Sequence, residues 1–218
     1  MRDMCVARID VTSSESTVRC LTPSRARAVR VARVITEMTA PAVLAGALLV
    51  VVALDTAKSG TSAIAWGLLA ALFAVAVPFA FIVSGARRGV WSTHHVKERE
   101  RRPFVLTVAL GSLLVGILVL AAWNAPRELL ALLVAMGAGL ASVLAVSRVW
   151  KVSIHAAVAG GTTVVLVLLF GPVLLAFALV ALAAAWSRTV LDDHTIAQVV
   201  VGLCLGAAVA ALVFGTLR

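Results

Sequence analysis

Residues 154–186 read IHAAVAGGTTVVLVLLFGPVLLAFALVALAAAW, an apolar run that is interrupted at Gly171-Pro172. As one helix, this stretch would be roughly 50 Å long at about 1.5 Å per residue, whereas the hydrocarbon core of a bilayer is about 30 Å thick. Glycine commonly ends a helix and proline commonly begins one. The stretch therefore predicts a tight hairpin of two short membrane helices, at 154–170 and 172–186.

The composition of the whole chain is that of a membrane protein. Hydrophobic residues make up 62% of the 218 residues and charged residues only 13%, whereas about 25% of the residues in a soluble domain are charged. Apolar runs that can cross a bilayer as helices occur at approximately 38–54, 63–84, 104–123, 129–147, 154–170, 172–186 and 195–216. We therefore predict an all-α fold, a polytopic membrane helix bundle of about six or seven transmembrane spans.

Two features inside these runs predict local geometry. Pro78 lies within a segment whose length already fits the bilayer, and proline inside a helix removes a backbone donor and bends the helix. Gly202 and Gly206 form a G-x-x-x-G pattern in the last segment, which is typical of closely packed membrane helices. We expect a kink at the first site and a tight helix contact at the second.

The start of the chain differs from the rest. Residues 1–34 are rich in arginine and lack the apolar core of a cleavable signal peptide, so we expect a basic tail, flexible or interfacial, ahead of a membrane domain at 35–218. From Ser24 to Met38 the pattern suits either a short helix on the membrane surface or a solvated basic tail. The three cysteines have no metal-ligand spacing, and we predict neither a metal site nor a disulfide.

The loops indicate a topology. The polar segments 85–103, 148–153 and 187–194 are each separated by two spans, so they and the N-terminal tail share one face of the membrane. Sixteen of the nineteen Lys and Arg residues lie on that face, and such an excess marks the cytoplasmic side. Because the composition is rich in Ala, Val and Arg, we expect an integral protein of a bacterial inner membrane. No motif of a nucleic-acid-binding domain is present, so no nucleic-acid partner is expected; the oligomeric state stays open.

Ionisable residues gather on this same face. All four histidines lie there, together with a group of basic residues: His94, His95, His155, His194, Lys97, Arg99, Arg101, Arg102, Arg148, Lys151 and Arg188. Ionisable residues in membrane segments are costly and usually functional, and arginine and lysine together suit a phosphate group. Histidine can serve as nucleophile or proton donor. The alternative is structural: a charge run such as KERER is commonly a solvated loop.

Three segments resemble the signatures of one family. SRTVLDDH, at 187–194, matches S-R-x5-H, the third signature of the type 2 phosphatidic acid phosphatase superfamily, which includes lipid phosphate phosphatases and vanadium-dependent haloperoxidases. KVSIHAA, at 151–157, resembles the second, P-S-G-H, and keeps Ser153 and His155. HHVKERERRPF, at 94–104, resembles the first, K-x6-R-P, through Arg102-Pro103. The resemblance covers about residues 90–205, with the signatures in the family's order.

The resemblance implies a mechanism without a metal or cofactor. It makes His194 the nucleophile that forms a phosphohistidine and His155 the acid that protonates the leaving oxygen. Fixed cations and donors would stabilise the charge on the phosphate oxygens. The residues that this assigns to the phosphate are Arg102, Arg188, Ser153, Ser187 and Lys97, and Lys151 is either a further phosphate ligand or a topological anchor. The residues that would contact and orient these side chains without touching the substrate are Asp193, Gln198 and His95.

One departure from the family pattern concerns the nucleophile itself. The family has an aspartate four residues after its nucleophile, and here Gln198 stands there; an amide oxygen still accepts from an imidazole N–H but carries no charge. The sequence thus favours a membrane phosphatase acting on a lipid phosphate or a polyprenyl (di)phosphate. A catalytically impaired lipid- or phosphate-binding protein and a small transporter remain alternatives, although a transport path should place ionisable residues at mid-membrane as well.

Overall fold

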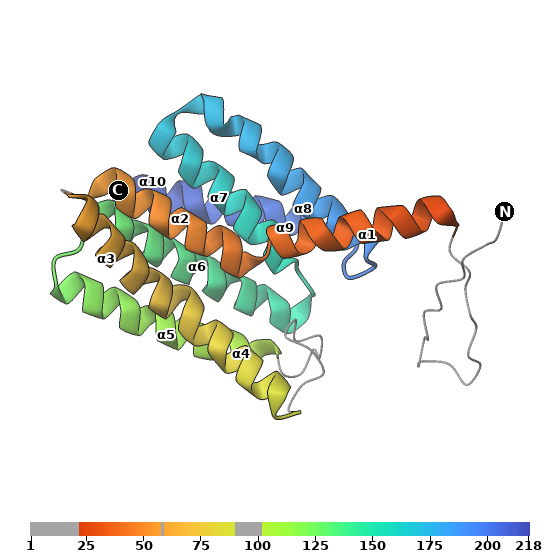
Figure 1. The fold of residues 1–218 in the computed structure, drawn as a ribbon, viewed down its shortest axis with the longest axis horizontal. Helices are drawn as coiled ribbons and strands as arrows, with labels where there is room; N and C mark the ends of the chain where they lie inside the picture. Colours follow the sequence, from red (N-terminus) through yellow and green to blue (C-terminus); the bar gives the residue numbers. More distant parts are fainter. Residues whose placement is uncertain (1–21, 58, 90–101) are drawn as a thin grey trace.

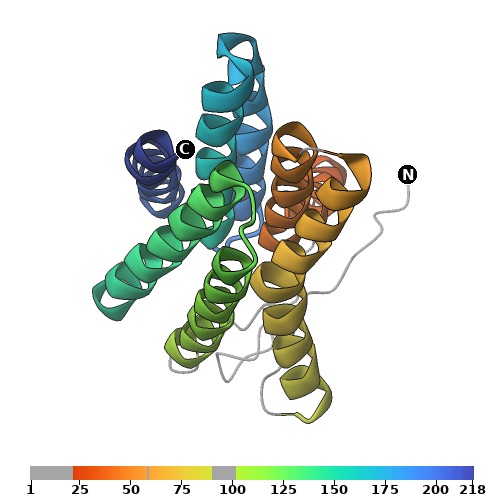
Figure 2. The same ribbon diagram turned by 90° about the vertical axis from the view of Figure 1, so that its left-hand side faces the viewer.

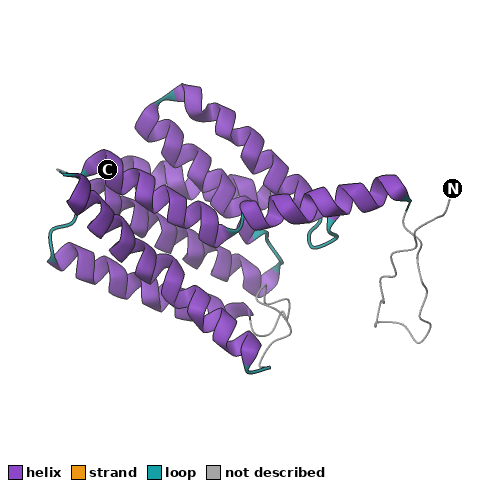
Figure 3. Ribbon diagram, viewed as in Figure 1, coloured by secondary structure: helices purple, strands orange, loops and turns teal. Residues whose placement is uncertain are grey.

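A computed structural model describes residues 22–57, 59–89 and 102–218, and every regular element in these ranges is a helix (Figure 3). The elements are α1 (Pro23–Met38), α2 (Pro41–Thr56), α3 (Gly60–Ala71), the π-helical turn η1 (Leu72–Ala76), α4 (Val77–Arg87), α5 (Arg102–Ala122), α6 (Arg127–Val149), α7 (Ile154–Phe170), the 3₁₀ helix η2 (Pro172–Phe177), α8 (Ala178–Val190), α9 (Ile196–Val209), the π-helical turn η3 (Ala210–Phe214) and α10 (Gly215–Leu217). The prediction of an all-α fold is confirmed for the described ranges.

The number of helices that can cross a membrane is slightly lower than the seven apolar segments. Five helical stretches are long and apolar enough: Gly60–Arg87, Phe104–Ala122, Arg127–Val149, Pro172–Val190 and Ile196–Leu217. A sixth results if α1 and α2, which meet at a bend of 41°, count as one span. α7 is apolar but has only 17 residues. Each predicted segment is a helix, yet α2 and α7 are short for a bilayer of about 30 Å.

The predicted hairpin between α7 and η2–α8 is confirmed. α7 ends at Phe170, and Gly171 adopts φ 90° and ψ 175°, a left-handed conformation that costs little only for glycine. Pro172 then begins the next helix, where its fixed φ suits the first turn. Helices α7 and α8 therefore pack side by side, as Figures 1 and 2 show.

α9 packs against α7 through its two glycines. A side chain on Gly206 would collide with the backbone carbonyl of Ala157, and one on Gly202 would meet the carbonyl oxygen of Ser153. The absence of a side chain therefore lets the two backbones touch. The start of α9 is also tied to the start of α7, because the Ser153 N–H donates to the Gln198 carbonyl over 3.2 Å. The predicted close contact is confirmed, and α7 is its partner.

Pro78 perturbs its helix one turn earlier than its own position. The Val77 N–H donates to the carbonyl of Leu72, five residues back, which makes a π-helical turn. The Phe73 carbonyl instead accepts a hydrogen bond of 2.7 Å from the Ser112 hydroxyl of α5. A proline-induced change of the hydrogen-bond ladder thus attaches the helix to its neighbour.

α1 is a packed helix, and it continues through the expected boundary at residues 34 and 35. Ala32 and Thr36 are buried on its inner face, and the Thr36 hydroxyl lies 2.9 Å from that of Ser187 in α8. Its opposite face leaves Val31, Val34 and Met38 exposed. Of the two expectations, the described part of the segment agrees with the helix, whose first turns extend beyond the bundle (Figure 1).

The polar loops that are described lie at one end of the bundle (Figure 1). Lys151, between α6 and α7, donates from Nζ to the carbonyl of Asp193, between α8 and α9, over 2.5 Å. α4 ends and α5 begins at this polar end too, and residues 90–101 lie outside the described ranges. The predicted grouping is therefore confirmed for the loops at 148–153 and 187–194, whereas the assignment of this end to the cytoplasm stays a prediction.

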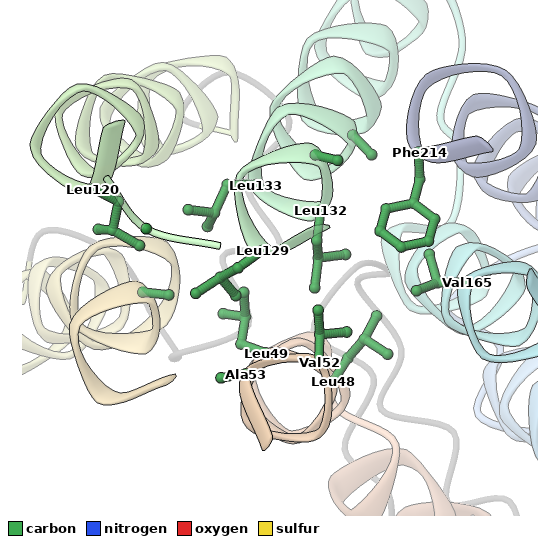
Figure 4. Close-up of a cluster of buried hydrophobic side chains, with 14 of the residues drawn as sticks. Leu48, Leu49, Val52, Ala53, Leu120, Leu129, Leu132, Leu133, Val165 and Phe214 are labelled. Atoms are coloured by element: carbon green, nitrogen blue, oxygen red, sulfur yellow. The ribbon is translucent and has the colours of Figure 1, made fainter. Parts of the chain in front are cut away.

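The hydrophobic core lies toward the opposite end. Its fully buried members come from the later turns of α2, the end of α5, the first turns of α6, and η3 (Figure 4). They include Leu49, Leu120, Leu129, Leu133 and Phe214. The bundle is thus tightly packed away from the polar loops.

Candidate active site at the polar end of the bundle

A cavity of about 1300 Å³ opens at the polar end. It is larger than the about 300–1,000 Å³ of most small-molecule sites. Apart from Thr162 in the middle of α7, its polar residues form one group, which we call the polar mouth: Arg33, Glu37, Ser147, Lys151, His155, Arg188, Asp192, Asp193 and His194. Most of its remaining wall is apolar and comes from α2, α4, α5, α6, α7 and α9. The cavity therefore offers a charged opening that leads into an apolar interior.

The loop after α8 folds back on Arg188. The N–H groups of Asp193 and His194 both donate to the Arg188 carbonyl, over 3.1 and 3.2 Å. Asp192, which precedes them, has φ 57°, a left-handed conformation that aspartate tolerates better than most residues. The tight loop holds His194 and Arg188 on the same wall although six positions separate them.

Gln198 orients the ring of His194. Its Oε1 lies 3.1 Å from His194 Nδ1 and also accepts the backbone N–H of Thr195 over 3.2 Å. Since the Thr195 N–H can only donate, it fixes the amide with its oxygen toward the histidine, and Nδ1 must then carry the proton. The lone pair of the neutral ring therefore resides on Nε2, as a nucleophile requires.

The same glutamine caps α9. The Gln198 N–H donates to the Thr195 hydroxyl over 3.3 Å, which completes a capping box at the start of the helix. The side chain that orients His194 is thus held by the local geometry of a helix terminus. The group that orients the His194 ring is therefore uncharged.

Arg188 is a buried cation with spare hydrogen-bonding capacity. Its side chain is on the cavity wall, the residue is only 7% exposed, and Nη2 lies 3.0 Å from Oδ2 of Asp193. Its Nε is buried and has no hydrogen-bond partner among the described residues. Buried donors are normally paired, so a bound anion is the natural acceptor for this N–H.

The second signature meets the third at the polar mouth. His155, in the first turn of α7, is buried and lines the cavity, and Lys151 lines it as well. The bonds from Lys151 to the Asp193 carbonyl and from Ser153 to the Gln198 carbonyl join the two segments. The structure therefore brings together His155, His194, Arg188, Lys151 and Asp193, five of the residues that the sequence selects.

The two serines stand behind the cavity wall and do not line it. Ser153 is fully buried and caps α7, where its Oγ accepts the Ala156 N–H over 3.4 Å. Ser187 is also fully buried; its hydroxyl donates to the Ala184 carbonyl over 2.8 Å and pairs with Thr36. The structure does not support the expected substrate contacts of these serines, because their hydroxyls are engaged in holding helices.

Three further expected residues give no side-chain geometry. His95 and Lys97 lie outside the described ranges. Arg102 is the first residue of α5, at the polar end, but its side chain is not described. Their assigned roles stay predictions.

The structure adds residues that the sequence analysis missed. α1 contributes Arg33 and Glu37 to the polar mouth, and α6 contributes Ser147, whose Oγ is buried with no partner in the described part of the chain. The i, i+4 spacing of Arg33 and Glu37 puts them on one helix face, but it does not reveal what that face contacts. The small, buried Ala32 and Thr36 of the inner face are the signal that α1 packs on another helix.

The arrangement suits an amphiphile with an anionic head. An imidazole with an oriented lone pair, a second histidine and a buried guanidinium line the opening of an apolar cavity. Together they can bind an anion, attack it and donate a proton to a leaving group. The chain matches no protein-family model, no curated protein and no solved structure.

Proposed function

We propose that this protein is an integral membrane phosphatase that removes phosphate from a lipid phosphate or a polyprenyl phosphate or diphosphate. One observation carries the proposal: His194, with its proton held on Nδ1 by Gln198, shares the mouth of a large apolar cavity with the buried Arg188. The match of residues 187–194 to the S-R-x5-H signature supports the same conclusion.

The proposed reaction has two displacement steps. His194 Nε2 attacks phosphorus, and the bond from phosphorus to the leaving oxygen breaks as that oxygen takes a proton from His155. Water then gives a proton to His155 and attacks phosphorus, and the bond from phosphorus to His194 Nε2 breaks; orthophosphate leaves and both histidines are restored. Arg188 stabilises the negative charge on the phosphate oxygens in both steps, through its fixed N–H donors.

The apolar cavity supports an amphiphilic substrate. The head group would lie at the polar mouth, and the tail would avoid water by occupying the interior. If the polar end faces the cytoplasm, as the distribution of Lys and Arg predicts, substrates made on that side, such as isoprenoid-linked phosphates, would have direct access.

Release of orthophosphate by the protein in lipid nanodiscs tests the proposal. Short-chain phosphatidate and farnesyl diphosphate serve as substrates for the wild type and for His194→Ala. We expect the variant to lose about a thousandfold or more in kcat, because no other group supplies the nucleophile. Arg148→Ala is a suitable control, since Arg148 is exposed and does not line the cavity. Equal release by the wild type and His194→Ala would exclude the phosphatase.

A phosphate-binding protein without turnover is the second candidate. It is favoured by the ion pair of Arg188 with Asp193, which weakens the support of Arg188 for a negative transition state. It is also favoured by the uncharged Gln198, which does not stabilise the positive charge that the His194 ring gains on attack. Binding of a lipid phosphonate that depends on Arg188, together with no orthophosphate release from either substrate, would establish this candidate in place of the enzyme.

A further inference from the structure

The apolar part of the cavity follows the long axis of the bundle. On α7 the lining continues from His155 to Val165, ten residues or about 15 Å along the helix. Along α9 and into η3, which continues it, the lining reaches Ala210, fourteen residues or about 21 Å beyond the first residue of α9. The cavity thus extends past the middle of a hydrocarbon layer of about 30 Å.

Small residues make this space. The lining face of α6 consists of Leu132, Ala135, Met136, Gly139, Leu140, Val143 and Ser147. A side chain on Gly139 would meet no atom within 4 Å, so this position is open. The α6 positions recur every three or four residues, so they form one face of the helix. Where alanine and glycine alternate with larger side chains on facing helices, a volume remains unfilled between them.

The cavity has a floor. Leu132, Val165 and Ala210 line its deep end and also belong to the hydrophobic core. Beyond them lie Leu129 and Phe214, which are fully buried and do not line the cavity. Figure 4 shows Leu132, Val165 and Phe214 directed toward a common centre. A guest that descends from the polar mouth therefore meets closely packed side chains here.

The cavity also has a side opening. Val43 of α2 and Phe79 of α4 line it, although they are 49% and 46% exposed. These two helices diverge toward the polar end in both views (Figures 1 and 2). A lipid tail can therefore pass from the surrounding bilayer into the interior without crossing water.

At the other end of the cavity, the polar mouth contains a side chain that suits an anionic ligand. Arg188 is more than nine-tenths buried, lines the cavity and keeps an unpartnered Nε among the described residues. The same space thus joins a donor for a head group to an apolar channel for a tail. The distance between mouth and floor is fixed by helices, and it is comparable to the length of an extended acyl or prenyl chain.

We propose that the substrate tail lies inside the bundle, along its axis, and that Leu132, Val165 and Ala210 set the longest tail that the protein accepts. This selection by length rests on the proposed phosphatase function and adds a specificity to it. A tail that remained in the bilayer would show no such limit.

A series of n-alkyl phosphates from butyl to hexadecyl tests the proposal in nanodiscs. For the wild type, kcat/KM rises with tail length and then breaks where the tail reaches the floor. Ala210→Phe fills the deep end, so the break moves to shorter tails and the longest substrates lose about tenfold or more. Leu132→Ala deepens the cavity, so the break moves to longer tails.

The matched control is Ala211→Phe, the same change at the next residue, which is exposed. It should leave the length profile unaltered. Because all variants share the same nanodiscs, partition of the substrates into lipid cancels between them. Turnover with a break that neither Ala210→Phe nor Leu132→Ala moves would overturn the length selection and leave the phosphatase intact.

A second measurement does not depend on turnover. A non-hydrolysable alkyl phosphonate with a photoreactive diazirine at the tip of its tail is crosslinked to the wild type and mapped by mass spectrometry. We expect labels on the segments that contain Leu132, Val165 or Ala210. Labels confined to outward-facing residues such as Leu212 would overturn the axial tail site, whether or not the protein is a phosphatase.

Discussion

Gln198 Oε1 lies 3.1 Å from Nδ1 of His194, one helical turn earlier, and the same oxygen accepts the Thr195 N–H. The amide is therefore part of the α9 terminus and part of the proposed nucleophile at once. An aspartate at this position would orient the ring and also stabilise its protonated form, whereas glutamine does only the first.

The contact between Gln198 and His194 predicts a shift of the pH profile. Gln198→Glu keeps the size of the side chain and the capping box but adds a carboxylate that stabilises the imidazolium. A higher pH is then needed to obtain the neutral nucleophile, so the acidic limb of kcat/KM should move to higher pH. Gln198→Leu should lower kcat/KM by about a hundredfold without that shift, because the ring loses its orientation. Equal profiles for the wild type and Gln198→Glu would show that Gln198 does not act on the catalytic ring.

Asp193 predicts a change in phosphate affinity. Its carboxylate is paired with Arg188 and would repel a bound phosphate. Asp193→Asn keeps the shape of the side chain and removes the charge, so orthophosphate should inhibit more strongly, by about threefold to tenfold. The measurement is the inhibition constant of orthophosphate at fixed pH. Weaker inhibition would mean that the ion pair is needed to hold Arg188 in place.

Thr36 predicts how firmly α1 is attached. Thr36→Val removes the buried hydroxyl that contacts Ser187, while Ser187 keeps its bond to the Ala184 carbonyl. The loss should lower the free energy of unfolding by about 1 kcal/mol, and denaturant unfolding in detergent measures it. Thr216→Val is the control, since Thr216 is exposed near the C-terminus and donates only within its own helix. Equal effects of the two substitutions would contradict a specific contact of α1.

Gly206 predicts the cost of separating α7 from α9. Even Gly206→Ala would force a methyl group against the backbone of Ala157, and the helices must move apart. We expect a loss of about 2 kcal/mol or more in the free energy of unfolding. Gly46→Ala should be neutral or slightly stabilising, because no atom lies within 4 Å of the added carbon and alanine favours a helix. Similar stability of both variants would contradict the close contact.

Much of the fold could be predicted because it depends on local chemistry. A few neighbouring residues are enough to predict three features: the helices of the apolar runs, the hairpin at Gly171-Pro172 and the close contact at Gly202 and Gly206. The bounds of α7 agree with the predicted 154–170, whereas α2 was expected at 38–54 and spans Pro41–Thr56, because Pro41 begins the helix.

The site was predictable only in part, for a physical reason. Arg188, His155 and His194 are chemically conspicuous in an apolar chain, and they do line the cavity. Arg33 and Glu37 belong to a basic segment whose pattern is the same whether it packs or is solvated, so only the tertiary contact of α1 with α8 reveals them. Ser153 and Ser187 are conspicuous in the same way but lie behind the cavity wall, since a hydroxyl in such a segment can hold helices together as readily as it can hold a ligand.

Two hydrogen bonds join the segments 151–157 and 193–198: one from Lys151 Nζ to the Asp193 carbonyl, and one from the Ser153 N–H to the Gln198 carbonyl. This link has a consequence for protein engineering. A chimaera that replaced Lys151 would lose the side-chain donor to the Asp193 carbonyl. The two segments should therefore be transplanted together with Arg188, whose carbonyl accepts the N–H groups of Asp193 and His194, as one unit that is discontinuous in the chain.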